Sequence, residues 1–405
     1  MKLKIKKIIR NTLLSFAALF ILLLVYVIYG IVWIYNFNKE QKTISKDIPN
    51  DYYQTFPLIQ DDNGYFGIVA TINKVHTDTL LIDTQASSSL AKQKDIDRYG
   101  ATYWGRRPIP TFNFYQQVYF SKIYEIESLK MGDCTLKGVL INSVPKENGM
   151  YNALYRTVLG RTVIENLIWK FNLDKRQMIL FSTKNQEALA HETNEFTFIK
   201  NGINKLPLYN EITDSLNFLL DLGSNYDIMI NEEMYNKLKK HYTPRRYINY
   251  RRAELTDTIA EFKEITMHCN NIAIPHCTLT YMPTLNRNIV GQIFMGKMNF
   301  ILAKDDLYTQ QRTDTISDCN SSLPELGFNI NIRDGIICIT SLELGGRAEK
   351  AGLKLKDKVL SIEKGKVNID NLSVPNGKLE KYIQKAKSLT IEIERNGTNK
   401  NITIM

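Results

Sequence analysis

The sequence predicts a mainly β protein made of two similar β units, followed by a smaller β module and preceded by one membrane helix. Short runs of β-branched and aromatic residues, separated by polar turns, recur from Gly64 onward. One set of features recurs in the same order in both halves of the chain, and residues 323–405 carry a separate pattern of strands and short helices. With 405 residues, 44% of them hydrophobic and 23% charged, the chain has room for two or three domains and an ordinary globular composition.

Residues 13–36 are predicted to form a transmembrane helix. The chain carries no charge over the 23 residues from Leu13 to Tyr35, and about 20 apolar residues span a hydrocarbon core as a helix. A cleavable signal peptide has an apolar core of about 7–15 residues and a small-residue cleavage site, so we interpret this segment as an uncleaved anchor. Trp33 and Tyr35 suit a membrane interface. A buried core helix is the alternative.

The formal net charge of +10 is concentrated at the N-terminus, where five basic residues precede the apolar segment. These residues are Lys2, Lys4, Lys6, Lys7 and Arg10. Basic residues next to a membrane helix stay in the cytoplasm, so residues 1–12 are predicted to be cytoplasmic and the rest of the chain to lie outside. The polar residues 37–60 are interpreted as a tether.

Two stretches of the chain share the same features in the same order. Each begins with an apolar run that ends in an aspartate, Asp83 or Asp221, and a pair of arginines follows 23 or 24 residues later. An aromatic run and two strands around a turn come next, and an apolar-apolar-glycine segment closes each stretch at Gly160 or Gly291. The period is too long for a solenoid, so we interpret residues 61–193 and 194–308 as two copies of one β unit.

The arginine pairs, Arg106 with Arg107 and Arg245 with Arg246, allow two interpretations. Arginines interleaved with tyrosines at residues 245–252 are also typical of a nucleic-acid-binding patch. The predicted location outside the cytoplasm and the recurrence of the pair in both copies favour a structural or substrate-facing loop. We therefore expect no nucleic-acid partner.

The five cysteines lack CxxC spacing, and their odd number excludes complete internal pairing. Histidines precede Cys269 and Cys277, but no third cluster closes a tetrahedral zinc site. Buried free thiols are therefore favoured over metal ligands. A disulfide between Cys269 and Cys277 is left open.

Residues 309–322 are polar and are interpreted as a linker to the C-terminal module. The module, residues 323–405, has predicted strands at residues 328–332, 336–340, 358–363 and 389–395. Short helices are expected at residues 346–352 and from Lys378 to Ala386. This size and mixture of elements suffices for a complete small domain.

The segment LIDTQASSSL around Asp83 resembles the active-site segment of retropepsin-like aspartic proteases, in which an apolar pair precedes Asp-Thr-Gly-Ala. The segments ending at Gly160 and Gly291 resemble the second signature of that family. The resemblance covers both copies and implies a bilobal, pepsin-type protease with Asp83 and Asp221 as its catalytic pair. Two carboxylates about 3 Å apart share one proton, so the ionised one can activate water while the neutral one binds the substrate carbonyl.

The resemblance also implies an active-site loop of Thr84, Gln85, Gly223 and Ser224 around the two carboxylates. The chain departs from the family pattern twice, because Gln85 stands in place of a glycine and Leu222 in place of a threonine. The alternative is therefore that the aspartates are turn or capping residues of an inactive relative. Asp227 is expected to be a turn or surface residue rather than a third acid.

The C-terminal module resembles a PDZ domain of the kind found in bacterial proteases. Leu326, Gly327 and Phe328 stand where that family has its carboxylate-binding loop, and GGRAEKAGLKLKDKVLSIE resembles its Gly-x-Ala-x-x-Ala-Gly-Leu signature, with Lys356 replacing a glycine. The resemblance implies binding of extended peptides by strand addition, with backbone N–H groups holding a terminal carboxylate. A module that only packs against the protease units is the alternative.

Taken together, these resemblances imply an aspartic endopeptidase that hydrolyses extended polypeptides without a metal or organic cofactor. We expect it to be a single-pass protein of a bacterial inner membrane with its main domains in the periplasm. Two copies in one chain suffice for a monomeric protease unit. The rival interpretation is a catalytically inactive, protease-derived scaffold that binds peptides.

Overall fold

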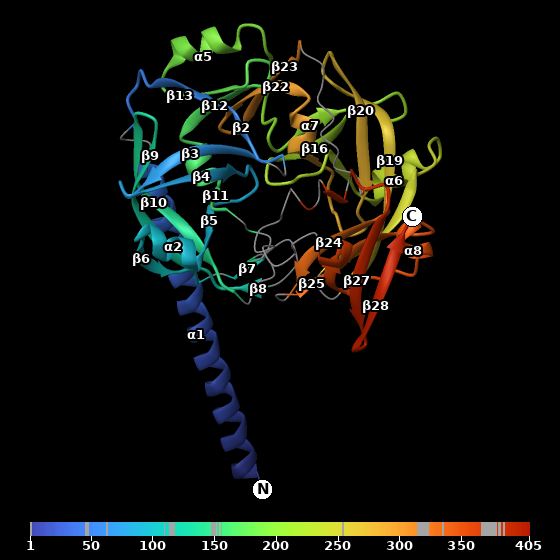
Figure 1. Ribbon diagram of the computed structural model, residues 1–405. Helices are drawn as coiled ribbons and strands as arrows, with labels where there is room; N and C mark the ends of the chain where they lie inside the picture. The colour runs from blue at the N-terminus through green and yellow to red at the C-terminus, as the bar shows by residue number, and fades with distance from the viewer. Residues whose placement is uncertain are drawn as a thin grey trace.

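The computed structural model (Figure 1) describes residues 2–44, 48–61, 64–108, 110–112, 118–146, 151, 154, 156–252, 255–313, 324–333, 336–365, 379, 382–383 and 385–405. The structure is mainly β, with one long apolar helix at the N-terminus, which confirms the predicted fold class.

Helix α1 (Lys2–Thr43) projects from the β domains (Figure 1) and includes a stretch, Asn11–Gln41, that is long and apolar enough to cross a membrane. Its mean hydropathy is 2.7, and its apolar side chains are almost all exposed, which excludes a buried core helix. The end of the helix packs against the β domains, where the Trp33 ring lies 5.7 Å from the ring of Trp104. The helix therefore extends into the range interpreted as a tether.

The first sheet has eight strands. In spatial order they are β2 (Ile59–Gln60), β3 (Phe66–Ile72), β4 (His76–Ile82), β11 (Val158–Leu159), β5 (Ser89–Lys92), β10 (Cys134–Val144), β9 (Lys122–Met131) and β6 (Thr102–Arg106). Helices α2 (Gln93–Tyr99) and α4 (Arg161–Ile164) follow β5 and β11, and the short strands β7 (Thr111–Phe112) and β8 (Val118–Tyr119) pair with each other.

The second sheet has twelve strands and includes the C-terminal module. Its first seven strands are β15 (Leu206–Leu208), β16 (Leu216–Asp221), β21 (Ile289–Gly291), β17 (Ile228–Ile230), β20 (Ile272–Tyr281), β19 (Leu255–Cys269) and β18 (Arg246–Arg252). It continues through β25 (Ile336–Glu343), β26 (Lys358–Ile362), β27 (Leu389–Arg395) and β28 (Thr398–Ile404), and β24 (Phe328–Arg333) pairs with β25. Helices α6 (Glu232–Leu238), α7 (Gln292–Met295) and α8 (Arg347–Lys350) follow β17, β21 and β25.

Seven strands of the first sheet have the same order as seven strands of the second. The order β3-β4-β11-β5-β10-β9-β6 corresponds element by element to β15-β16-β21-β17-β20-β19-β18. In both sheets a short strand, β11 or β21, lies parallel to the strand that leads to an aspartate and antiparallel to the strand after it. Equivalent backbone bonds follow, from Arg161 N to Ala86 O at 2.8 Å and from Gln292 N to Ser224 O at 2.9 Å.

A third, six-stranded sheet draws its strands from both halves of the chain. Its order is β1 (Tyr53–Pro57), β13 (Gln177–Ser182), β12 (Leu167–Asn172), β22 (Met298–Ala303), β23 (Asp306–Gln311) and β14 (Thr197–Ile199), with α5 (Gln186–Thr193) after β13. Phe171 of β12 stacks on Phe300 of β22 at 4.4 Å, in one apolar core shared by both halves. The interpretation of residues 37–60 as a tether is wrong, because β1 belongs to this sheet.

The C-terminal module has its own apolar core, formed by residues such as Phe328, Ile339 and Ile391. The four strands and the first short helix predicted for it are confirmed by β24, β25, β26, β27 and α8. The predicted strands end at residue 395, but the structure has one more, because β28 follows and pairs with β27. Most of the second predicted helix, Lys378 to Ala386, and most of the linker 309–322 lie outside the described residues.

Candidate active site

Two buried strands deliver Asp83 and Asp221 to the same place. Strand β4 ends at Ile82 and β16 ends at Asp221, and the residues before both carboxylates are fully buried. The short parallel strands fix the ends, since Asp83 N donates to Leu159 O at 3.0 Å and Asp221 is paired in register with Gly291. The fold therefore brings together the two predicted aspartates, which lie 138 positions apart in the sequence. Both are half-buried.

The two carboxylates are hydrogen-bonded to each other, and each accepts further bonds from its own loop. Asp83 Oδ1 accepts from Gln85 N at 2.7 Å and from Ala86 N at 2.9 Å, whereas Asp221 Oδ1 accepts from Gly223 N at 2.9 Å. Gly223 lies so close that an added Cβ would stand 2.3 Å from Asp83 Oδ2. The second loop therefore requires glycine at this position.

The pKa values of both carboxylates lie above the ordinary value of an aspartate. Burial raises the pKa of Asp83, although its two backbone N–H donors act in the opposite direction. Burial and the neighbouring charge of Asp83 together raise the pKa of Asp221 well above its ordinary value. Because two carboxylates in contact cannot both ionise cheaply, the two share one proton, and their titration belongs to the pair rather than to either residue.

Thr84 and Gln85 connect the first loop to the backbone of β16. The Thr84 hydroxyl donates to Leu220 O at 2.8 Å and accepts from Leu222 N at 3.1 Å. The Gln85 amide donates to Leu220 O at 2.7 Å, so its side chain is directed at the β16 backbone rather than filling the space between the carboxylates. Leu222, which is fully buried, stands at the position of the second loop that corresponds to Thr84. It has no hydroxyl and so makes no equivalent hydrogen bond to the first loop.

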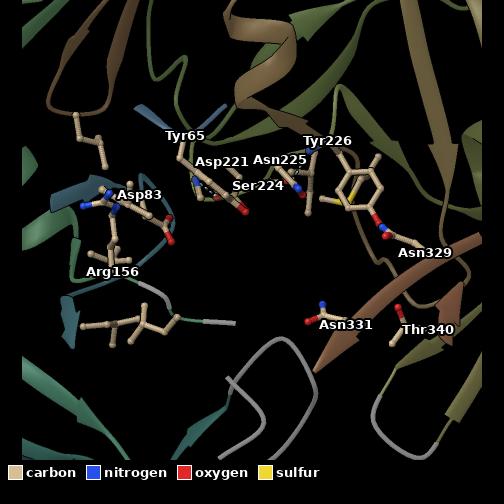
Figure 2. Close-up of a pocket in the computed structure, with 18 of the residues that line it drawn as sticks. Tyr65, Asp83, Arg156, Asp221, Ser224, Asn225, Tyr226, Asn329, Asn331 and Thr340 are labelled. Atoms are coloured by element: carbon tan, nitrogen blue, oxygen red, sulfur yellow. Dashed lines mark hydrogen bonds between the residues drawn. The ribbon is translucent and has the colours of Figure 1, made fainter. Parts of the chain in front are cut away.

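The pair opens into a cavity of about 430 Å³ (Figure 2). Apolar side chains from both sheets surround the carboxylates, and uncharged polar side chains from the C-terminal module contribute to the wall. The apolar lining residues include Leu81, Leu90, Leu154, Val158, Met229 and Ile289, and the polar ones include Asn225, Asn329, Asn331, Thr340 and Ser341. This arrangement can hold an extended, partly apolar chain across the two carboxylates.

The remaining predicted site residues lie in two different places. Ser224 lines the cavity beside Asp221. Leu326, Gly327 and Phe328 lie in the module instead, where Leu326 and Phe328 are buried in its core and Gly327 has a φ of 81°. Gly327 O accepts from Glu343 N at 2.7 Å, which holds this loop against the end of β25.

Asp227 is not the turn or surface residue that we expected. It is 3% exposed, and its Oδ2 accepts from Lys297 Nζ and from Thr278 N, both at 2.7 Å. Burial raises its pKa, while the Lys297 charge acts against that rise. Asp227 is therefore half of a buried ion pair with Lys297, just before β17.

Sequence reasoning missed Arg156 and the module residues of the cavity wall. Arg156 lies two residues before β11 and near Asp83 in Figure 2, and its Nη1 lies 3.8 Å from Asp78 Oδ1. Its position just before the predicted apolar-apolar-glycine segment was an available signal. The sequence contains no such signal for Asn329 and Asn331, because their place in the cavity wall depends on how the module docks.

The arginine pairs and the cysteines have structural surroundings. Arg246 is buried and bonded to Glu261 at 2.6 Å, and Arg106 lies over the ring of Phe120. Four cysteines are buried free thiols, including Cys269 and Cys277, and Cys319 lies outside the described residues. Within the described ranges, no group of three or more His, Cys, Asp or Glu side chains could hold a metal ion.

No protein-family model matches the chain, and no curated protein matches it in sequence. Among solved structures, a retropepsin-like aspartic protease from Rickettsia conorii is similar at 18% identity and a TM-score of 0.24, covering 32% of this chain and 92% of its own. Conglutin gamma from lupine seeds is similar at 8% identity and a TM-score of 0.41, and basic 7S globulin from soybean at 9% and 0.37. These two cover 66% and 67% of this chain and 98% and 100% of their own. Such TM-scores are too low to assign an activity, which has to be inferred from the geometry of the site.

Proposed function

We propose that this protein is a membrane-anchored, two-lobed aspartic endopeptidase with a C-terminal PDZ-like module. The observation that carries the proposal is the pair of hydrogen-bonded carboxylates, Asp83 and Asp221, at equivalent positions of two sheets with the same strand order. Two carboxylates that share one proton supply both the base and the acid that hydrolysis by such a pair requires. The open cavity beside them leaves room for a polypeptide.

In the proposed reaction, Asp83 acts as the base and Asp221 as the acid. The Asp83 carboxylate takes a proton from water as the water oxygen bonds to the scissile carbonyl carbon, and Asp221 gives its proton to the carbonyl oxygen. When the C–N bond of the resulting neutral diol breaks, Asp83 passes its proton to the departing nitrogen. Asp221 recovers a proton from a diol hydroxyl, which restores the starting state.

The rest of the chain gives this reaction a location and a substrate class. The N-terminal helix would anchor the protein in a bacterial inner membrane with the β domains in the periplasm, in keeping with the basic residues before it. The apolar surroundings of the carboxylates favour apolar residues next to the cleaved bond. The module would bind extended peptides by strand addition to β24, one edge of which is paired with β25.

One observation favours a second candidate, a catalytically inactive peptide-binding scaffold. Leu222 supplies no hydroxyl at the position that corresponds to Thr84, so the second loop is braced from one side. A loop held less firmly positions its carboxylate less accurately, and errors of about 1 Å cost on the order of 100-fold in rate. The two candidates differ in a single measurable outcome, peptide cleavage.

The test is cleavage of a peptide library by the full chain in nanodiscs between acidic and neutral pH. We expect cleavage by the native protein and its loss in Asp83→Asn and in Asp221→Asn. Asp214→Asn is the matched control, because Asp214 is an exposed aspartate of the same half of the chain. Cleavage that persists in both pair variants would exclude the carboxylates from the reaction, and an inactive native protein that still binds peptides would favour the scaffold.

A further inference from the structure

The C-terminal module is joined to the second half of the chain by main-chain hydrogen bonds. Strand β25 pairs antiparallel with β18, with Ser341 opposite Tyr250 and Glu343 opposite Ile248. Leu344 N adds a bond to Tyr247 O at 2.9 Å. The module is therefore docked on the hairpin of β18 and β19 by a continuous sheet and not only by its linker.

The alternation of side chains along β24 gives the module two different faces. Phe328 and Ile330 are buried in the module core, at 0% and 6% exposure. Successive side chains of a strand point to opposite faces, so Asn329 and Asn331 point away from that core. Both line the cavity that contains the two carboxylates, and Thr340 from β25 lies in the same wall.

The two sides of this cavity differ in chemistry. Figure 2 shows Asp83 and Arg156 on one side and Asn331 and Thr340 on the other, across open space. The side near the carboxylates combines their charges and that of Arg156 with apolar side chains, whereas the module wall presents uncharged amide and hydroxyl groups. Amides and hydroxyls both donate and accept hydrogen bonds and carry no charge, so this wall matches groups of the same kind.

We propose that Asn329, Asn331 and Thr340 form a substrate subsite for an uncharged polar side chain. The inference rests on the proposed peptidase function and adds a substrate class to it: extended polypeptides with apolar residues at the cleaved bond and a polar, uncharged residue some positions away. The module thus selects substrates through the outer face of β24 and β25. This face is distinct from the edge of β24 that would take a peptide by strand addition.

The test changes the charge of this wall and measures which peptides the full chain selects. Asn331 is exposed, so Asn331→Asp and Asn331→Lys can be made without burying a charge. We expect Asn331→Asp to favour peptides with Lys at the position that lies against Asn331. Asn331→Lys should favour peptides with Glu at that position. Between the two variants, the Lys-to-Glu ratio of kcat/KM should differ by about tenfold or more.

Matched controls come from the same module. Asn399→Asp and Asn399→Lys place the same charges on β28, at an exposed asparagine outside the cavity lining, and should leave the ratio unchanged. Thermal unfolding of all four variants verifies that they fold. If the Lys-to-Glu ratio of kcat/KM changes equally in the Asn399 and Asn331 variants, or changes in neither pair, the proposed subsite is refuted.

Binding separates the failure of the subsite from the failure of the peptidase function. The same Lys and Glu peptides, labelled with fluorescein, are titrated into full chains that combine Asp83→Asn with each Asn331 variant. If the native protein cleaves nothing but the binding preference reverses, the subsite stands and the peptidase function fails. If peptides are cleaved and neither preference moves, the function stands and the subsite is refuted.

Discussion

Gln85 supplies one of three hydrogen bonds that connect the loop after Asp83 to the backbone of Leu220 and Leu222, at the end of β16 and just beyond it. Its amide and the Thr84 hydroxyl both donate to Leu220 O, at 2.7 and 2.8 Å, and Leu222 N donates to the Thr84 hydroxyl at 3.1 Å. Gln85→Met removes the amide with little change in length, and Thr84→Val removes the hydroxyl with little change in shape. The two changes together remove both donors from one buried carbonyl.

The expected costs follow from what each change leaves unpaired. In Gln85→Met the Leu220 carbonyl keeps its bond from Thr84, so the local free energy of opening should fall by about 1 kcal/mol, the net contribution of one hydrogen bond. Thr84→Val leaves the buried Leu222 N–H without its acceptor, which should cost about 2 kcal/mol. The double variant also leaves the Leu220 carbonyl without either donor, so its cost should exceed the sum by about 1 kcal/mol.

Native-state hydrogen exchange of the full chain measures these local free energies, with peptides that cover β16 and its following loop. Peptides from β27 serve as the internal control and should exchange alike in all variants. Exchange in β16 that changes additively in the double variant would show that Gln85 and Thr84 do not share the Leu220 carbonyl. In that case the role given to Gln85 is refuted.

Three further predictions concern the pair and its support. Gly223→Ala should lower kcat/KM by about 100-fold, because a Cβ there would lie 2.3 Å from Asp83 Oδ2 and displace it. Asp221→Asn should raise the unfolding midpoint in urea at neutral pH: folding raises the pKa of Asp221, so the native protein loses stability as pH rises through that value. The gain should vanish below the ordinary pKa of 3.8, and a pH-independent gain would contradict the assignment. Lys297→Met should cost about 3–5 kcal/mol by leaving the buried Asp227 unpaired, and adding Asp227→Asn should restore most of the loss in the same urea titration; a single variant as stable as the native protein would refute the ion pair.

The elements that local sequence patterns could predict are those whose signal lies within a few residues. Among the short runs expected from Gly64 onward, FGIVATI forms β3 (Phe66–Ile72), and the apolar run before Asp83 forms β4. The recurrence of features around Asp221 brought the second carboxylate into the prediction. The pair could be found because each half carries its own strand-to-aspartate signal, although the two are far apart in sequence.

Contacts made only by the folded chain left no such signal. Strand β1 was interpreted as part of a tether because its alternation of half-buried and exposed residues depends on pairing with β13. Asp227 looked like a turn residue because its partner, Lys297, lies 70 positions away. The module wall of the cavity depends on the pairing of β18 with β25, and no sequence pattern in either strand predicts this pairing.

The two departures from the repeat become intelligible once the loops are compared in space. Gly223 must remain glycine because the Asp83 carboxylate lies against it, whereas Gln85, at the corresponding position, sends its side chain to the β16 backbone. The Thr84 hydroxyl bonds to Leu220 O and to Leu222 N, and the Gln85 amide adds a second bond to Leu220 O. The side chains that connect the two loops therefore all come from the first loop. The loops are therefore specialised, one for bracing and the other for close approach, and this division explains how Leu222 can lack a hydroxyl while Asp83 and Asp221 remain in contact.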